Sequence, residues 1–431
     1  LFIPICLETL LYMLSGMVDT LMLSSVNDQA VGAVGTANTY IGIFIIMFSV
    51  ISSGMVAVMT QNIGAGRPGV AYQARQLGLA FNAVLGIILS LILAFGAGTI
   101  LAGVGVADAL MQPARTYLQI VGGFCILNAL IPICSSYLRA FGFSKEPLYA
   151  SIIGNVINFC LNAFFLFVLH KGVAGVATAT VISRIINLVI VVMLGAVLVK
   201  AKQHPERESN REVMGQIIRI GLPSACETAI YNVSMTLVIR FLNQMDAQGL
   251  NVTARSYTMQ ITNFSYCVGA ALAQANAIMT GWRIGAKEYD ACDRGTRKAA
   301  IIGVIVAVIL ETMFALCSGW IMQLFSKDPQ MVSLVGKLLA IDIVLEMGRV
   351  TNLVYGQALK TSGDAVFPVV MGACFMILCS VGGTYLFGIR LGLLAVGAYI
   401  GMAGDECVRA VGMYLRWKSG KWKEKGLVKS R

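Results

Sequence analysis

The chain has 431 residues, of which 57% are hydrophobic and only 12% are charged, whereas soluble globular proteins carry about 25% charged residues. So few charges exclude a large water-soluble enzyme, and so much apolar sequence excludes a disordered chain. The net charge of +11 would favour a nucleic-acid partner in a soluble protein. In a membrane protein it is typical of basic inner loops, so we expect no nucleic acid.

Apolar runs along the chain predict twelve membrane-spanning helices, because each crossing takes about 20 apolar residues. The most polar stretch, residues 200–211, lies near the middle and predicts a linker between two halves. We therefore expect an all-helical polytopic protein with two pseudo-symmetric six-helix bundles. Its parts are a lobe over 1–200, a cytoplasmic linker over 201–214, a second lobe over 215–418 and a basic tail over 419–431. The predicted spans are 2–24, 36–61, 77–104, 116–138, 147–169, 173–199, 215–242, 252–281, 299–324, 332–359, 366–388 and 392–415.

The first apolar run does not resemble a cleaved signal, because it carries Glu8 and Asp19 and lacks a small-residue cleavage site. Since the chain opens at Leu1 without a methionine, we expect that an original N-terminal tail has been trimmed. The 11 cysteines form no CxxC pair, and the two histidines lie far apart in sequence. Neither a disulfide framework nor a histidine metal site is therefore expected.

The basic residues predict the orientation of the spans. If the first loop lies outside, 22 of the 32 lysines and arginines fall on the inner side and seven on the outer side. Three more, Arg184, Arg349 and Arg409, fall within spans. This bias places both termini in the cytoplasm. We expect the membrane to be a plasma membrane of the bacterial inner type. The basic tail is then expected to be a solvated anchor beside acidic headgroups.

The two halves of the sequence resemble each other at a nearly constant offset. Because each repeat holds six spans, both halves enter the membrane in the same direction, and their axis runs along the membrane normal. Two such bundles around a shared cavity are typical of alternating-access transporters. The matched residues are Pro4, Glu8, Thr9 and Tyr12 with Pro223, Glu227, Thr228 and Tyr231; 63–65 with 284–286; and Leu138, Gly142 and Pro147 with Leu359, Gly363 and Pro368.

An ionised carboxylate inside a membrane span costs free energy, and Asp19 lies inside the first span. No basic residue lies within a helical turn of it. Its expected neighbours are Asn158 and Asn162 of the fifth span, which are four residues apart and so share a helix face, and Thr180 of the sixth. One carboxylate with amide and hydroxyl oxygens could hold a small cation, or the carboxylate could carry a proton. A hydrogen-bonded structural aspartate, with the asparagines as interhelical glue, is the alternative.

Pro4 lies fifteen residues before Asp19, which is about 22 Å along a helix. A kink at Pro4 could reposition Asp19. Alternatively, Pro4 lies in the first turn, where a proline does no harm to the helix.

In the second half, acids and an arginine recur at helical spacing in two spans. These spacings allow acid–arginine pairs within one helix, and we expect charge-compensated structural clusters. Glu8 and Glu227 occupy equivalent positions of the repeat, where they could act as caps, snorkel to the interface or have a function. Glu311 is isolated and unexplained. The two clusters are Asp342, Glu346 and Arg349 in the tenth span, and Asp405, Glu406 and Arg409 in the twelfth.

Enzyme signatures are missing from the sequence, which has no HExxH, GxSxG or P-loop motif. We therefore expect a protein that is not an enzyme, has no cofactor, and draws its energy from an H⁺ or Na⁺ gradient.

Over essentially its whole length the sequence resembles the multidrug and toxic compound extrusion (MATE) transporters. The resemblance rests on motifs that occur in the family's order. It implies two six-helix lobes in a V around a cavity, and efflux coupled to inward H⁺ or Na⁺ flow. The motifs are IPICLETLLYMLSGMVDTLML in the first span, GLPSACETAIYN in the seventh, NFCLNAFFLF followed by KGVAGVATATVIS, and the paired loops YLRAFGFSKEP and ALKTSGDAVFP.

For the first half, the resemblance implies that Asp19 is the ion-responsive group and Pro4 the bend. The family's amino-lobe cation site maps to Asp19, Asn158, Asn162 and Thr180, which would bind a metal only if Na⁺ is the coupling ion. Some members have a second aspartate where this chain has Asn162. One carboxylate in place of two disfavours sodium and favours proton coupling by Asp19.

For the second half, the resemblance implies that the family's carboxy-lobe site is missing or rebuilt. Other members have an acid in the seventh span where this chain has Tyr231, with Glu227 one turn earlier, and their tenth-span acid falls at Arg349. A rebuilt site would use Glu227, Asp342 and Glu346.

Together these observations predict a monomeric secondary antiporter in the lipid bilayer that exports amphipathic, cationic organic compounds. A lipid-linked oligosaccharide flippase of the same superfamily is the alternative, but it predicts extra spans and a strongly cationic cavity, and only three arginines lie in spans here. A non-transporting receptor or scaffold is the alternative of another class, against which the duplication argues.

Overall fold

The computed structural model describes residues 1–24, 28–103, 106, 108–200, 206–245, 249–323 and 325–428. Residues 201–205 of the predicted linker and 429–431 of the predicted tail lie outside this description. The chain is helical throughout the described ranges, which contain no strand. This confirms the all-helical class that was predicted from the apolar runs.

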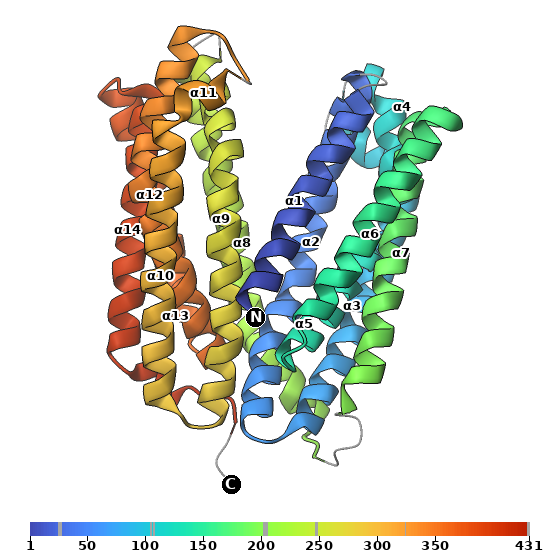
Figure 1. Cartoon of the computed structure of the whole chain (residues 1–431), viewed down its shortest axis with the longest axis vertical. Coiled ribbons are helices and arrows are strands. Elements are labelled where there is room, and N and C mark those ends of the chain that lie inside the picture. Colours follow the sequence, from blue (N-terminus) through green and yellow to red (C-terminus); the bar gives the residue numbers. More distant parts are fainter. Residues whose placement is uncertain are drawn as a thin grey trace. The chain divides into compact units, whose positions relative to one another are not determined.

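The predicted spans one to six correspond to helices of the first half (Figure 1). The fourth span is broken, because Leu110–Gly122 and Ile126–Ala140 meet at 43°. The break follows Gly122 and Gly123, where a π-helical turn ends, and glycines and π-turns are common sites of helix kinks. The elements are α1 Phe2–Ser24, α2 Asp28–Gly64, α3 Pro68–Gly103, α4 Asp108–Tyr117, η1 Leu118–Gly122, α5 Ile126–Ala140, α6 Lys145–Ala163, η2 Phe164–Val168 and α7 Gly172–Leu198.

The predicted spans seven to twelve correspond to helices of the second half. Seven helices of the described chain are long and apolar enough to cross a membrane, or eight with the bent pair counted as one span. Helices α8, α9, α12 and α14 are not among them and are markedly more polar. The elements are α8 Asn210–Met245, α9 Leu250–Gly285, α10 Tyr289–Leu316, α11 Ser318–Met322, α12 Pro329–Ser362, α13 Val366–Phe375, η4 Met376–Val381, η5 Thr384–Arg390, α14 Leu394–Lys418 and η6 Lys421–Glu424.

The chain divides into two compact units between Gly221 and Leu222, with Phe2 grouped with the second unit. The division therefore falls inside α8, seven residues beyond the end of the predicted linker. Pro223 follows the division directly and lies within the helix. Because proline removes one helical hydrogen bond, this is a point at which α8 can bend.

The beginning of α8 packs backbone to backbone on α2. A Cβ atom at Gly54 would lie 1.9 Å from the carbonyl oxygen of Ile217, and one at Gly221 would lie 1.7 Å from that of Val50. Only glycine allows two helices to approach this closely. The two glycines thus anchor the first turns of α8 to the N-terminal unit.

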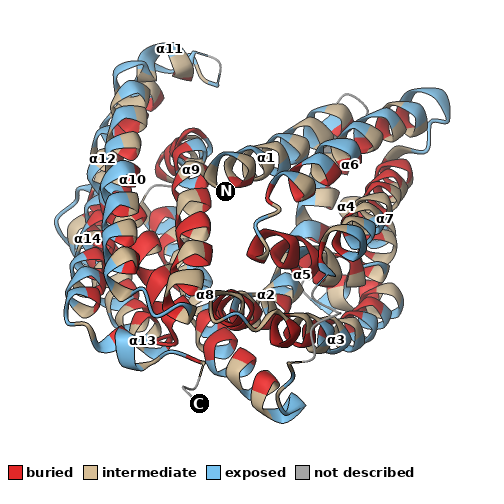
Figure 2. Cartoon of the chain, turned by 60° about the horizontal axis from the view of Figure 1, so that its bottom comes forward, coloured by how far each residue is buried: buried red, intermediate tan, exposed pale blue. Residues whose placement is uncertain are grey.

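The share of buried residues differs strongly between helices of the N-terminal unit. Figure 2 shows α5 with mostly buried positions, whereas α1 and α6 present mostly intermediate and exposed ones. Along the whole of α1 only Ile5 and Leu23 are buried. The core of this unit is formed instead by α2, α3, α4, α5 and α7 around residues such as Phe48, Leu93 and Leu118. Helix α1 is therefore held less by apolar packing than its neighbours are.

The segment after α14 is docked on the C-terminal unit, and the expectation of a solvated tail is wrong for this part. Trp422 is 1% exposed. Its ring stacks on Trp417 at 4.1 Å between centroids and meets the edge of Tyr289 at 5.9 Å. Its Nε1 atom donates a hydrogen bond to the carbonyl oxygen of Trp417 at 2.9 Å. Aromatic burial outweighs the solvation of the few lysines in this segment.

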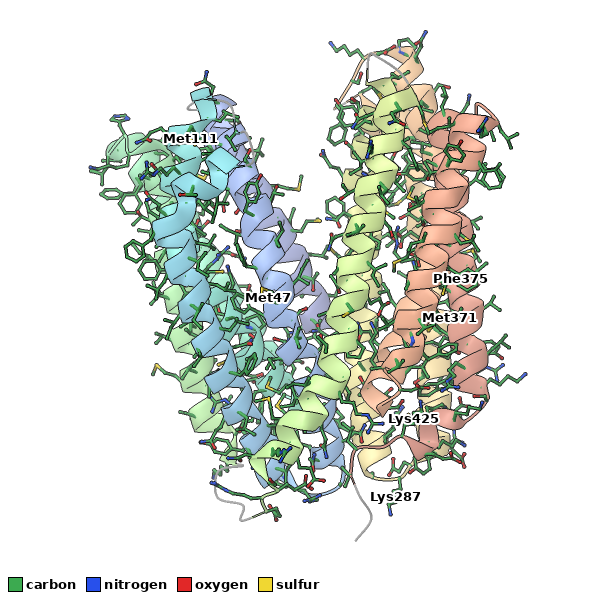
Figure 3. The ribbon with its side chains drawn as sticks, turned by 180° about the vertical axis from the view of Figure 1, so that it is seen from behind. Met47, Met111, Lys287, Met371, Phe375 and Lys425 are labelled. Carbon is green, nitrogen blue, oxygen red and sulfur yellow. The ribbon has the colours of Figure 1, made fainter. Side chains whose placement is uncertain are left out.

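A carboxylate completes the docking of residues 420–428, which we call the strap. Asp364, in the turn between α12 and α13, accepts from Arg416 Nε at 2.7 Å and from Lys425 Nζ at 2.6 Å. Gly363 has φ +100°, and a Cβ there would lie 2.2 Å from the carbonyl oxygen of Lys425. Figure 3 shows Lys425 at the same end as Lys287, which lies between α9 and α10. The strap therefore joins α14 to the turn between α12 and α13 and, through Tyr289, to the start of α10.

Trp422→Ala is expected to release the strap. The substitution removes a buried aromatic ring, which typically costs about 3–5 kcal/mol. We expect faster tryptic cleavage at the strap lysines and a lower unfolding temperature in detergent. The exposed Glu424→Ala is the control and should change neither quantity. Equal cleavage rates for Trp422→Ala and the unmodified protein would contradict the docked position.

Asp364 is expected to make this end of the molecule sensitive to acid. Burial alone would raise the pKa of Asp364, but the hydrogen bonds and charges of Arg416 and Lys425 outweigh it, so that the pKa lies below its ordinary value of 3.8. A lowered folded-state pKa means that the stabilisation is complete above pH 3.8 and is lost as the pH falls through the folded-state value. Thermal unfolding across acidic pH should show this loss, and Asp364→Asn should abolish it. Asp290→Asn, at an exposed carboxyl, should unfold like the unmodified protein at every pH.

Candidate functional site

The N-terminal unit brings the predicted polar residues of three helices together. Asp19 Oδ1 of α1 accepts a hydrogen bond from Asn162 Nδ2 of α6 at 2.7 Å. Asn162 Nδ2 also donates to Asn158 Oδ1 at 3.2 Å. Asn158 Nδ2 in turn donates to Ser183 Oγ of α7 at 3.5 Å. The i, i+4 spacing of the asparagines places both amides on the face of α6 that meets α1 and α7.

Thr180 lies near this cluster in sequence but makes a different contact. Its hydroxyl is buried and donates to the carbonyl oxygen of Val176 in its own helix at 2.9 Å. One turn further on, Ser183 contacts Asn158 instead. Both hydroxyls belong to the stretch GVATATVIS, so the sequence indicated the right segment of α7, but Ser183 and not Thr180 makes the contact.

The sequence interpretation missed Arg184 as a partner of Asp19. Arg184 of α7 lies close enough to interact electrostatically with Asp19, and both act on Tyr117 of α4. A lone arginine in an apolar span requires a counter-charge, and that requirement was the available signal. Asp19 therefore accepts a hydrogen bond from an amide of α6 and interacts electrostatically with a guanidinium of α7.

The cluster offers oxygen atoms but little negative charge. Asp19 supplies its carboxylate, and Asn162 Oδ1 is buried with no hydrogen-bond donor among the described residues. Among the residues that the structure places, no three of His, Cys, Asp or Glu converge to hold a metal ion. The Asp19 carboxyl can bind and release a proton. A sodium ion at this cluster would have to be held mainly by neutral oxygens.

Polar side-chain contacts link the sparsely packed α1 to other helices of its unit. Besides the Asp19–Asn162 bond, Glu8 Oε2 accepts from Arg139 Nη2 of α5 at 2.5 Å. Pro4 lies on α1, fifteen residues before Asp19.

In the C-terminal unit the two predicted acid–arginine clusters merge into one network. Arg409 binds Asp405 with Nε and Nη2, both at 2.9 Å, and Glu406 at 2.9 Å. Glu406 also lies 3.5 Å from Arg349 Nε of α12, and Arg349 contacts Glu346 directly. The pairs within each helix agree with the predicted spacing. The bridge between α12 and α14 through Glu406 was not predicted.

Glu227 forms an ion pair of its own, with Lys360 Nζ of α12 at 2.5 Å. This pair repeats the Glu8–Arg139 pair, since both of its members are displaced by the repeat offset. Glu227 and Tyr231 line a cavity of about 250 Å³. Asp342 and Glu346 are not among the residues that line it, so the structure does not assemble a site from Glu227, Asp342 and Glu346. The polar and aromatic lining is Glu227, Thr228, Tyr231, Tyr266, Arg349, Asn352, Gln357, Lys360, Glu406 and Arg409.

The family model described as MatE matches residues 4–164 and 223–386. The chain belongs to the MatE family. The two matched segments begin at Pro4 and Pro223, which are equivalent residues of the internal repeat, so the family match and the repeat agree on the duplication. The predicted membership of the MATE transporters is therefore confirmed.

Relatives in the MATE family match along nearly the whole chain. An uncharacterized transporter, YisQ of Bacillus subtilis, is 34% identical over 431 residues, covering 99% of this chain and 94% of the relative. A probable multidrug resistance protein, NorM of Thermotoga maritima, is 23% identical and covers 99% of this chain and 93% of the relative. Both matches therefore extend over nearly the whole of this chain and most of each relative.

Solved MATE structures confirm the fold. A crystal structure of MATE in the straight conformation superimposes with a TM-score of 0.89 at 19% identity, covering 98% of this chain and 96% of that one. An outward-facing MATE family transporter gives 0.88 at 18% identity, with 100% and 96% coverage. The chain is a multi-pass membrane transporter with the MATE fold of twelve helices in two bundles.

Proposed function

We propose that this MATE transporter is a proton-coupled antiporter that exports amphipathic, cationic organic compounds across a plasma membrane by alternating access. Several relatives are named as probable multidrug resistance proteins, which supports the substrate class. The excess of basic residues in alternate loops supports cytoplasmic termini. We further propose that the protein acts as a monomer in the lipid bilayer, without a cofactor, and that it is not an enzyme.

The observation that carries the proposal is the position of Asp19 on a sparsely packed helix. Asp19 accepts from Asn162 at 2.7 Å, and hydrogen bonds to a carboxylate are stronger than bonds between neutral groups. Protonation removes that charge and weakens this polar contact of α1 with α6. Since α1 has only two buried side chains, a change of a few kcal/mol is enough to bias its position.

The choice of proton over sodium rests on the charge of the site. Asn162 stands where a second carboxylate would lower the cost of binding a metal cation, and the described residues hold no cluster of three metal-ligating acids, cysteines or histidines. One proton neutralises a single carboxylate, whereas a sodium ion held by one carboxylate and neutral oxygens would have its desolvation less well offset. Proton coupling by Asp19 therefore has the stronger support.

The cavity of the C-terminal unit supports cationic, amphipathic substrates. Tyr231 and Tyr266 offer aromatic faces, which attract organic cations. The carboxylates in the lining are already paired with cations, so the support comes from the aromatic faces and not from free negative charge. A cavity with a few polar groups among aromatic walls is typical of small-molecule sites.

Transport by purified protein in liposomes tests the proposal. Liposomes loaded with ethidium are given an acidic exterior, and in parallel an inward Na⁺ gradient at equal pH. We expect the pH gradient to accelerate ethidium release and the Na⁺ gradient to leave it unchanged, with protein-free liposomes as control. Release driven only by Na⁺ would overturn proton coupling. Failure to move any solute would favour the receptor or scaffold, and scrambling of a lipid-linked sugar would favour the flippase.

A further inference from the structure

Glu311 of α10 is a buried carboxyl that the proposed function does not use. Its side chain is fully buried, with 0% exposure. Neither of its carboxyl oxygens has a hydrogen-bond partner among the described residues. Ser265 of α9 lies next to it, but its hydroxyl does not reach hydrogen-bond geometry. A buried, unpaired carboxylate in a membrane helix is costly and marks a functional site.

The register of α10 against α12 places Glu311 beside a second carboxyl. Moving eight residues along each helix from the contact between Gly303 and Val350 brings Glu311 opposite Asp342. The electrostatic interaction of Glu311 with Asp342 and with Glu346, one turn further along α12, agrees with this register. Two close approaches fix this register. A Cβ atom at Gly303 would lie 2.6 Å from Val350 Cγ1, and a Cβ atom at Gly336 would lie 3.2 Å from Ser318 Oγ.

The three carboxyls form a cluster that has unused oxygens. Asp342 is 2% exposed and Glu346 0% exposed. Asp342 Oδ2 and Glu346 Oε2 have no hydrogen-bond donor in the described part of the chain. Three buried acids on two packed helices therefore share only one adjacent guanidinium, that of Arg349.

The surrounding network does not supply the missing positive charge. In the described chain it contains five carboxyls and two guanidinium groups, and adding the buried Arg255 would still leave an excess of acids. Uncompensated charges inside a membrane protein cost several kcal/mol each. The network consists of Glu311, Asp342, Glu346, Asp405 and Glu406 with Arg349 and Arg409.

We propose that Glu311, Asp342 and Glu346 form a proton-holding site in the C-terminal unit, separate from Asp19. Bound protons balance the excess of carboxyls. A sodium ion is the alternative occupant, and the experiment below separates the two. The groups that interact with its carboxyls are Ser265 and Tyr266 of α9, Arg349 of α12, and Tyr399 and Glu406 of α14.

The site gives the transporter a second place to take up protons. Like-charged neighbours titrate as a unit, so release of one proton would alter the charge that Arg349 and Glu406 share at the cavity wall. Only this role in coupling rests on the proposed proton antiport. The presence of the protons does not depend on transport and can be measured in the purified protein at rest.

Infrared spectroscopy of the purified, full-length protein tests the proposal. A protonated carboxylic acid has a carbonyl band separate from that of a carboxylate, and the band shifts in heavy water. We expect the unmodified protein to show this band at neutral pH, and Glu311→Gln to lose a large part of it. Asp342→Asn serves as a second variant if Glu311→Gln does not fold. Glu288→Gln, at an exposed carboxyl, is the matched control and should leave the band unchanged.

The outcomes separate this site from the proposed function. A band that is unchanged in both Glu311→Gln and Asp342→Asn would overturn the proton site, as would its absence from the unmodified protein. A band that appears only when Na⁺ is removed would assign the site to sodium and overturn the proposal. The expected band with no transport in liposomes would leave the proton site intact and remove the antiport.

Discussion

Asp19→Asn is expected to abolish proton-driven efflux while leaving the fold intact. The amide keeps the size of the side chain but cannot exchange a proton, so α1 loses the charge change that biases its position. In liposomes, a pH gradient should then fail to accelerate ethidium release above the protein-free rate. The unfolding temperature in detergent should stay close to that of the unmodified protein, because Asp19 is only partly buried.

Two further measurements make this result specific. Asp290→Asn replaces an exposed carboxyl at the start of α10 and should transport normally. Exchange of ethidium across the membrane without any ion gradient should persist more strongly in Asp19→Asn than gradient-driven release does, if Asp19 serves coupling. Normal pH-driven efflux by Asp19→Asn would remove Asp19 from the mechanism.

Arg409→Met is expected to cost about 3–5 kcal/mol of folding free energy. The substitution keeps much of the side-chain volume but leaves Asp405 and Glu406 without the guanidinium that binds them at 2.9 Å. Both acids are buried, so water cannot replace the lost partner. Chemical unfolding in detergent should show the loss directly, together with a lower yield of folded protein.

Arg390→Met is the matched control, because Arg390 is an exposed arginine at the end of η5. Its removal should change stability by less than about 1 kcal/mol. Arg409→Lys should fall between the two, since it restores the charge without the two-pronged geometry. Unfolding of Arg409→Met at the same denaturant concentration as the unmodified protein would show that the network does not stabilise the fold.

The sequence was sufficient to predict the helices of both halves, because the bilayer favours long apolar segments at its crossings, although only seven or eight of the described helices meet that length and composition. It did not predict the break of the fourth span at Gly122 and Gly123. A broken helix has the same composition as a continuous one, and only the packing of its neighbours determines where it bends. The docking of Trp422 escaped prediction for a similar reason, since a basic segment with one aromatic residue is also typical of a solvated tail.

For the candidate site, the sequence predicted residues on one helix better than partners on different helices. The spacing of Asn158 and Asn162 placed both amides on one face, and the structure brings that face to Asp19. Arg184 could not be assigned to Asp19, because that pairing depends on how the helices of the unit pack in three dimensions. A pair of residues on different helices becomes visible only in the folded structure.

The two glutamate ion pairs are related by the internal repeat. Glu8 and Glu227 are equivalent at an offset of 219 residues, and their partners Arg139 and Lys360 are displaced by 221 residues, the other offset of the repeat. Searching the repeat for basic residues at matched positions would have predicted both ion pairs. The repeat therefore contains contact information that a reading of single spans does not use.

The docked strap determines where this protein can be extended for laboratory use. A purification tag or fluorescent reporter that replaces residues after Ser419 would remove Trp422 and uncover the ring of Trp417, which is otherwise 2% exposed. Such a fusion would attach the tag to a destabilised end of α14. It would also expose an aromatic surface through which molecules could self-associate. Tags should instead follow Val428 through a flexible spacer, so that the stacked tryptophans and the Lys425–Asp364 pair stay in place.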